Sequence, residues 1–148
     1  MNNEMIDLCL GIAVRAHRGQ KYPDGNPVIL HPLTVGLKGS TPDEICAGFL
    51  HDVVEDTDVT FDDLLAEGVA PNIVDALRLL THDKREEFLD YVRRIARSGN
   101  ELAIAVKLND LSHNLDRGRR MGYDRLVAKH ESALDVFRNE YGKGCADD

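Results

Sequence analysis

The chain has 148 residues, 43% of them hydrophobic and 30% charged, which predicts one globular domain spanning residues 1–148. Its formal net charge of −8 argues against a protein that binds a nucleic-acid polymer over its whole surface, because such binding uses Lys and Arg. With no apolar run of about 18 residues, no signal segment and no paired cysteine spacing, the chain is expected to avoid membranes and to be cytoplasmic.

The first third of the chain alternates helical patterns with a loop. Apolar residues recur at three- and four-residue steps up to about His17, which predicts an amphipathic helix. Residues 18–32 contain two glycines and three prolines, a density of helix breakers that predicts a loop. A short helix is expected after His31. The Ser40–Pro42 run then supplies a cap and a first-turn proline for a helix over about 43–55.

The rest of the chain is also predicted to be helical. Further helices are expected at about 60–65, 71–80, 88–95, 101–117 and 124–141. Asp83 and Glu86 resemble a capping box for the helix at 88–95. The apolar stripe of the last helix suits either the core or the seam of a homo-oligomer. No sustained two-residue alternation occurs between turns, so the predicted fold is all-α, a compact helical bundle.

Polar residues interrupt the apolar pattern of the helix at 43–55. His51 and Asp52 are adjacent, and Glu55 and Asp56 follow on the same helical faces one turn later. Three carboxylates and an imidazole crowd together unfavourably without a cation, so a divalent ion is one interpretation. The other interpretation, from these residues alone, is a helix-capping or salt-bridged pair, with His31 a hydrogen-bonded loop histidine.

A second polar pattern lies on the helix at 101–117. One polar stripe runs beside its apolar stripe and consists of Lys107, Asp110, Asn114 and Arg117. Asp110 is therefore expected to face a polar seam rather than the apolar core.

Four segments of the chain resemble the hydrolase half of the RelA/SpoT alarmone enzymes, which are HD-domain proteins. They are AHRGQ at 16–20, ILHP at 29–32, LHDVVEDT at 50–57 and VKLNDLSHN at 106–114. The His-Asp dyad is shared by many phosphohydrolases, whereas its extension to Thr57 is a much more specific signature. The resemblance implies the compact helical bundle of an HD domain.

The same resemblance implies a metal site and a reaction. It makes the metal ligands His31, His51, Asp52 and Asp110, with Mn²⁺ as the usual ion, although iron, zinc or cobalt would accept these ligands. It makes Glu55 and Asp56 the pair that orients and deprotonates the attacking water. The implied function is that of a metal-dependent (p)ppGpp 3′-pyrophosphohydrolase, which releases pyrophosphate from the 3′ position of a guanosine alarmone.

The expected substrate contacts depart from the family in one loop. Asn114 matches a nucleotide-contacting position, and the cations expected to offset phosphate charge are Arg18, Lys21 and Lys107. Where the family carries an Arg-Lys-Ser run, this chain has Tyr22-Pro23-Asp24. Tyr22 is therefore predicted to stack on a base in place of an arginine, with less purine specificity.

Two alternatives stay open. The first is an HD phosphohydrolase acting on another nucleotide phosphate, which the change at Tyr22 favours. The second is a non-catalytic nucleotide-binding HD module, which has no need of the proton-accepting Glu55 and Asp56. In each case the partner is a small-molecule nucleotide.

The remaining histidines are not expected to bind metal. His17 and His113 match histidines of the family motifs and are expected to support the site or to pack. His82 and His130 have no motif neighbours and are predicted to be structural or exposed.

Overall fold

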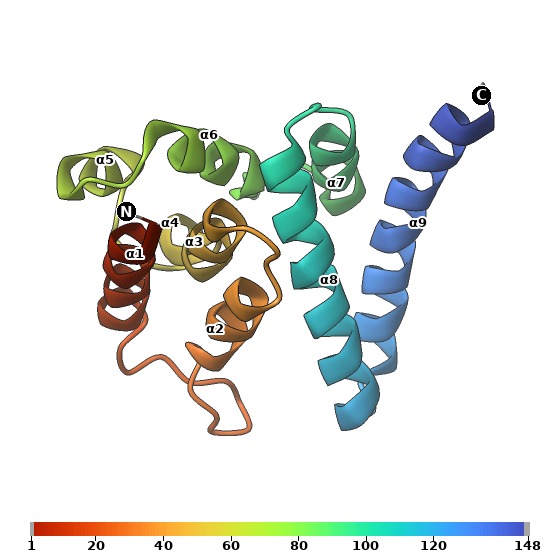
Figure 1. Cartoon of the computed structure of the whole chain (residues 1–148). Coiled ribbons are helices and arrows are strands. Elements are labelled where there is room, and N and C mark those ends of the chain that lie inside the picture. Colours follow the sequence, from red (N-terminus) through yellow and green to blue (C-terminus); the bar gives the residue numbers. More distant parts are fainter. Residues whose placement is uncertain (1, 147–148) are drawn as a thin grey trace.

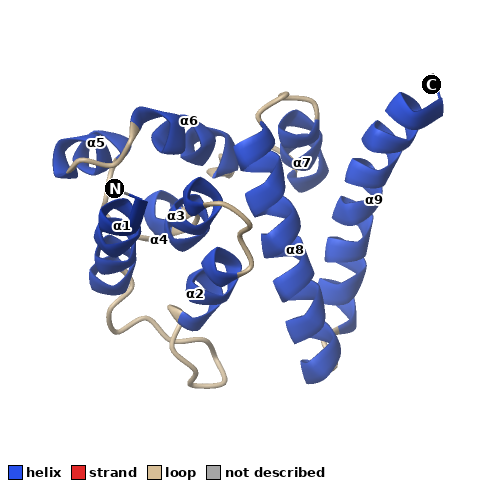
Figure 2. Ribbon diagram, viewed as in Figure 1, coloured by secondary structure: helices blue, strands red, loops and turns tan. Residues whose placement is uncertain are grey.

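A computed structural model describes residues 2–146, so Met1, Asp147 and Asp148 of the predicted domain lie outside the described residues. The helices are α1 Asn2–Ala16, α2 Leu30–Leu37, α3 Pro42–Leu50, α4 Val53–Asp56, α5 Phe61–Glu67, α6 Pro71–Leu80, α7 Phe88–Ala96, α8 Glu101–Met121 and α9 Asp124–Ala146 (Figure 1). In this part of the chain β pairing is limited to an isolated bridge between Lys21 and Pro27, and Figure 2 shows no strand. The predicted all-α fold is confirmed.

Several helices begin where the sequence places a cap. The Thr41 hydroxyl accepts a hydrogen bond from the Glu44 backbone N–H, and Pro42 follows at the first helical position of α3. Thr60 and Asp63 form a reciprocal capping box at the start of α5. Local sequence alone therefore fixes these two starts. Within residues 2–146 no helix is both long and apolar enough to cross a bilayer.

The capping box predicted from Asp83 and Glu86 is wrong. Helix α7 begins after Glu87 without a side-chain cap. Asp83 instead accepts hydrogen bonds from the backbone N–H and the guanidinium of Arg85, while Glu86 forms an ion pair with Arg94 on α7 itself. Both carboxylates are therefore paired with arginines close to them in the chain, and charge-assisted hydrogen bonds to a guanidinium are stronger than one to a backbone N–H alone.

The helix predicted over 43–55 is two helices. Helix α3 ends at Leu50 and α4 begins at Val53, so His51 and Asp52 form the junction between them. Asp52 adopts φ −104° and ψ −2°, a sparsely populated region in which many active-site residues are found. As a result, His51 and Asp52 do not lie on the surface of one continuous helix.

Two glycines let α2 and α3 pack unusually close. A Cβ atom on Gly48 would lie 2.7 Å from the Cα of Gly36, and one on Gly36 would overlap the ring of Phe49. Only residues without a side chain permit this approach. As a result, His31 at the start of α2 lies against His51 at the end of α3.

The core surrounds α3, which packs against α1, α2, α6 and α8 (Figure 1). Cys9 and Cys46 are buried free thiols, as their apolar spacing predicts. Helix α9 lies alongside α8 and turns His130 and Phe137 inward. The apolar stripe predicted for this helix is buried at Phe137, whereas Tyr141, one turn further on, is 51% exposed.

Candidate metal and nucleotide site

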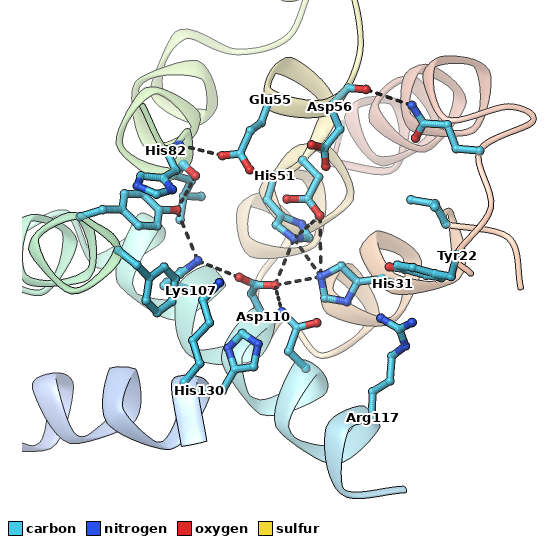
Figure 3. Close-up of a pocket in the computed structure, with 18 of the residues that line it drawn as sticks. Tyr22, His31, His51, Glu55, Asp56, His82, Lys107, Asp110, Arg117 and His130 are labelled. Carbon is cyan, nitrogen blue, oxygen red and sulfur yellow. Dashed lines mark hydrogen bonds and ion pairs between the residues drawn. The ribbon is translucent and has the colours of Figure 1, made fainter. Parts of the chain in front are cut away.

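Residues from separate elements bring the four predicted metal ligands together. Helix α2 carries His31, the α3–α4 junction carries His51 and Asp52, and α8 carries Asp110 (Figure 3). His31 Nε2 lies 2.8 Å from Asp110 Oδ1 and 3.7 Å from Asp52 Oδ2. His51 Nε2 lies 3.1 Å from Asp52 Oδ2 and 3.3 Å from both Asp110 Oδ1 and His31 Nε2.

The separations among His31, His51 and Asp52, and those from both imidazoles to Asp110, fit the coordination shell of one divalent ion. Ligand atoms about 2.0–2.2 Å from a shared ion lie about 3.0–3.5 Å from one another in octahedral or tetrahedral geometry. The measured distances of 2.8–3.7 Å fall around that range. Two imidazoles and two carboxylates suit a borderline or hard divalent metal.

The outer ring nitrogens fix both histidines in the tautomer that a metal needs. His51 Nδ1 donates to the carbonyl oxygen of Gly48 at 2.6 Å, which leaves the Nε2 lone pair facing Asp52 and Asp110. His31 Nδ1 lies 2.7 Å from His113 Nδ1, so one of these nitrogens donates and the other accepts. With His113 as acceptor, His31 Nε2 also presents a lone pair.

The charges of the clustered side chains favour the binding of a cation. Burial alone would lower the pKa of His51, but the carboxylates of Asp52 and Asp110 raise it well above its usual value. Burial would raise the pKa of Asp110, but the Lys107 ammonium and the two histidines hold it well below its usual range. Burial would likewise raise the pKa of the half-buried Asp52, but the His51 imidazole lowers it, so both carboxylates stay ionised and favour a positive charge beside them.

Glu55 and Asp56 lie beside these ligands and form a second acidic group together with Asp52. Oxygen atoms of Asp52, Glu55 and Asp56 lie within 4.8 Å of one another. The Glu55 carboxylate accepts a hydrogen bond from the His82 backbone N–H at 2.7 Å, which holds its orientation. Burial and the neighbouring carboxylates raise the pKa of Glu55 and of Asp56, a direction that strengthens each as a proton acceptor.

The His-x-x-Gln turn after α1 supports Asp56 from behind. His17 is buried, and its Nδ1 lies 2.8 Å from Gln20 Oε1. The Gln20 amide nitrogen donates to the backbone carbonyl of Asp56 at 2.9 Å. This chain of contacts ties the end of α4 to the loop after α1. His17 is thus in a supporting position, and it makes no contact with the metal ligands.

Two polar residues of α8 hold Asp110 in place. Lys107 Nζ lies 2.9 Å from Asp110 Oδ2, and the Asn114 amide nitrogen donates to Asp110 Oδ1 at 3.1 Å. Lys107 is buried, because its ammonium also contacts the ring and the hydroxyl of Tyr91. The sequence predicts Lys107 and Asn114 as substrate contacts, and the structure places both in the wall of the site.

A cavity of about 600 Å³ opens around the ligand cluster. Tyr22 and Arg117 lie at one end, and Lys107 and His130 lie at the other, with the predicted metal ligands between them (Figure 3). Lys21 also lines this cavity. The exposed Arg18 is outside the lining, so its predicted contact with substrate stays a prediction.

Arg117 and His130 are cavity residues to which sequence reasoning assigned no role. Arg117 continues the polar stripe of α8 and could have been found from that periodicity. Its guanidinium Cζ lies 3.7 Å from the ring centroid of Tyr22. The prediction that His130 is structural or exposed missed its place in the cavity, because only the packing of α9 on α8 brings it there.

Comparisons with known proteins agree with this arrangement. The chain is 32% identical over 142 residues to a GTP pyrophosphokinase of Streptomyces coelicolor, which matches 89% of this chain and 17% of that protein. It is 31% identical over 121 residues to a guanosine-3′,5′-bis(diphosphate) 3′-pyrophosphohydrolase of Aquifex aeolicus, covering 76% of this chain and 17% of the relative. The chain thus spans under a fifth of the length of these curated relatives. No protein-family model matches the chain.

The fold has a solved counterpart. A structure described as a metazoan ortholog of SpoT that hydrolyses ppGpp matches with a TM-score of 0.69 and 24% sequence identity, over 94% of each chain. The helical bundle is therefore the fold of that structure. Ligand atoms of His31, His51 and Asp52 lie within 4.8 Å of one another, and Asp110 Oδ1 contacts both imidazoles, a ligand set of the HD-domain class. Within that class, the chain is similar over most of its own length to the RelA/SpoT hydrolase-like proteins.

Proposed function

We propose that this chain is a metal-dependent hydrolase that releases pyrophosphate from the 3′ position of (p)ppGpp. The observation that carries the proposal is the convergence of His31, His51, Asp52 and Asp110 beside the Glu55–Asp56 pair. The names of the relatives from Aquifex aeolicus and from the metazoan structure support the same chemistry. Mn²⁺ is the proposed ion, held by the four ligands.

The chain's own residues supply positioning and proton transfer. A bound divalent ion would acidify a water molecule and polarise a phosphoryl oxygen. Glu55, held by the His82 backbone N–H, and Asp56 accept the proton of the attacking water. The water oxygen bonds to the 3′-linked phosphorus and the bond from that phosphorus to the ribose 3′ oxygen breaks. This oxygen takes up the proton that the carboxylate pair received from the water and leaves as a hydroxyl. The products are pyrophosphate and GDP, or GTP from the pentaphosphate.

Tyr22 supports a second candidate substrate. The loop that would contact the base offers the Tyr22 ring, which any base can stack on, with Arg117 against it. A cation therefore still lies beside the expected position of the base, but it is Arg117 of α8 and not an arginine of the loop. An HD phosphohydrolase acting on another nucleotide phosphate is therefore the alternative substrate assignment.

A substrate panel tests the proposal. Purified protein with Mn²⁺ is assayed against ppGpp, against nucleotides with a single 3′-phosphate, and against 5′-triphosphates, with product identity followed by chromatography. Release of pyrophosphate from ppGpp is the expected result. Turnover of another nucleotide, with none of any 3′-pyrophosphate, would replace the alarmone with that substrate.

Glu55→Gln tests the role of the carboxylate itself. This substitution keeps the size of the side chain but removes its capacity to accept a proton, so we expect kcat to fall by a factor of about 10²–10⁴. Metal affinity should stay near that of the unmodified protein, because Glu55 is outside the ligand set. Loss of metal together with activity would show that Glu55 is a ligand instead.

A further inference from the structure

The end of the cavity formed by α7, α8 and α9 gathers nitrogen groups around one aromatic ring. Lys107 Nζ lies 5.9 Å and Lys129 Nζ 4.3 Å from the ring centroid of Phe88. The ring of His130 meets Phe88 edge-on, with centroids 6.4 Å apart. All four side chains line the same cavity as the predicted metal ligands. Two cations and an imidazole therefore share one end of the site.

His130 is buried with one ring nitrogen that has no hydrogen-bond partner among the described residues. Its side chain is only 6% exposed, and its Nδ1 atom is buried without a hydrogen bond among the residues that the structure describes. A buried polar nitrogen without a partner costs about 1–3 kcal/mol, so such a group in a cavity wall points to a ligand. Because no bond fixes Nδ1, the imidazole can turn a nitrogen toward a bound group.

The chemistry of this end selects an anion. Lys129 is exposed at the cavity mouth and Lys107 is buried in its wall, while a neutral imidazole offers one N–H donor. Phosphate oxygens accept from all three groups. Lys107 already shares its charge with Asp110, so the Lys129 ammonium is the charge that a sugar or a base would leave unmatched.

The position of this end determines which phosphate it takes. Tyr22 and Arg117 occupy the opposite end, and the predicted metal ligands lie between (Figure 3). A nucleotide whose base reaches Tyr22 and whose reacting phosphate reaches the ligand cluster extends its remaining phosphate toward His130. In ppGpp the terminal phosphate of the 3′-pyrophosphate is joined directly to the reacting phosphate, whereas the 5′-diphosphate is attached through the ribose. We assign this end to the terminal 3′ phosphate, and the GDP titration below tests the 5′-diphosphate as the other occupant.

From this geometry we propose that His130, Lys129 and Lys107 form a subsite for the terminal phosphate of the pyrophosphate group, which fixes the direction in which the substrate lies. The proposal rests on the proposed function for the identity of the substrate. His130 is a substrate-binding residue that touches the departing pyrophosphate, and it takes no part in the proton transfer at Glu55.

Direct binding of the two products tests the subsite without requiring turnover. Pyrophosphate and GDP are titrated separately into the Mn²⁺-loaded full chain by calorimetry at fixed free Mn²⁺. His130→Phe keeps an aromatic ring but removes both nitrogens, and we expect it to weaken pyrophosphate binding about 10-fold while GDP binding stays unchanged. Lys129→Gln should weaken pyrophosphate binding in the same selective way.

Matched variants separate binding from folding and from general charge. His130→Asn and His130→Gln each restore an amide N–H near one ring nitrogen, and at least one should recover pyrophosphate affinity. Arg138→Gln removes a charge from the same helix, where Arg138 is exposed and paired with Asp135, and should change nothing. A purely structural role for His130 would instead weaken the binding of both products to the same degree.

Three results would overturn the subsite. They are a wild-type protein that binds no pyrophosphate, a His130→Phe variant with unchanged pyrophosphate affinity, and variants that weaken GDP as much as pyrophosphate. If the wild-type protein hydrolyses no 3′-pyrophosphate but the titration gives the selective loss, the proposed function fails and the anion subsite stands.

Discussion

The guanidinium of Arg117 lies over the ring of Tyr22, with its Cζ atom 3.7 Å from the ring centroid. One partner comes from the loop after α1 and the other from the last turns of α8. The pair joins a flat aromatic surface to a delocalised cation, two groups that stack well on a base. It forms the wall of the cavity opposite the Lys107 end.

Removal of the Tyr22 ring should therefore weaken nucleotide binding. Stacking of a base on an aromatic side chain is worth about 1–3 kcal/mol, so Tyr22→Ala should raise KM by about 5- to 100-fold. Tyr22→Phe keeps the ring and should stay within a few-fold of the unmodified protein. Steady-state kinetics on the best substrate of the panel measures both. Equal kinetics for the Ala and Phe variants would remove Tyr22 from the substrate contacts.

The buried ion pair of Asp110 and Lys107 makes Asp110→Ala a poor test of metal binding alone. The alanine leaves the Lys107 ammonium buried without its 2.9 Å partner, which typically costs about 3–5 kcal/mol of unfolding free energy. The double variant Lys107→Met with Asp110→Ala removes both charges and should recover much of that stability. Urea unfolding of the metal-free proteins measures the three values. A single Asp110→Ala variant as stable as the double variant would contradict the coupling.

His113 should influence metal affinity without touching the metal. Its ring stacks on His31 with centroids 5.0 Å apart, and burial beside His31 lowers the pKa of His113 to about 4. It is therefore neutral at pH 7 and able to accept the proton of His31 Nδ1. His113→Phe keeps the stacking but removes the acceptor, and we expect metal affinity to fall about 10- to 100-fold. A metal titration monitored by activity or calorimetry checks this, and unchanged affinity would exclude a supporting role.

His130 should make stability depend on pH. Burial lowers the pKa of His130 from its ordinary 6.5 to about 4, so between these values the unfolded chain binds a proton that the folded chain does not. The contribution of the neutral imidazole to stability is fully present above pH 6.5. It is lost progressively as the pH falls toward 4, by at most about 3 kcal/mol.

His130→Phe isolates that contribution. Phenylalanine does not titrate, so the variant should lose less unfolding free energy than the unmodified protein between pH 7 and pH 4.5. Urea unfolding of both metal-free proteins across this range gives the difference between their unfolding free energies at each pH. The groups that the two proteins share titrate equally in both, so their contributions cancel in this difference. Parallel pH profiles would show that His130 is charged in the folded protein.

Some features of the fold and the site could be predicted because they depend on short stretches of sequence. Thr41 and Thr60 cap helices whose first turns lie directly beside them. The periodicity of α8 places Lys107, Asp110 and Asn114 on one face whatever the helix packs against. Family motifs then pointed to His31, which lies in a loop-rich segment where periodicity gives no information.

Other features depended on partners far away in the chain. The helix predicted over 43–55 breaks at His51–Asp52, where the side chains meet His31 of α2 and Asp110 of α8. Helix propensity is too weak to resist such contacts. The capping box predicted at Asp83 failed for a local reason instead, because arginines close in the chain pair with both carboxylates. Lys107 was predicted to offset phosphate charge, but its burial against Asp110 and Tyr91 could not be read from the spacing of α8.

The sequence by itself determined which elements are helical and which residue types are available for a metal, because backbone periodicity and ligand chemistry are local properties. Only the tertiary structure decided that Gly36 and Gly48 let α2 approach α3, so that the nitrogens of His31 and His51 lie 3.3 Å apart. It also brought His130 into the cavity through the packing of α9 on α8. Such placements follow from side-chain volume and charge summed over several helices, which no single segment encodes.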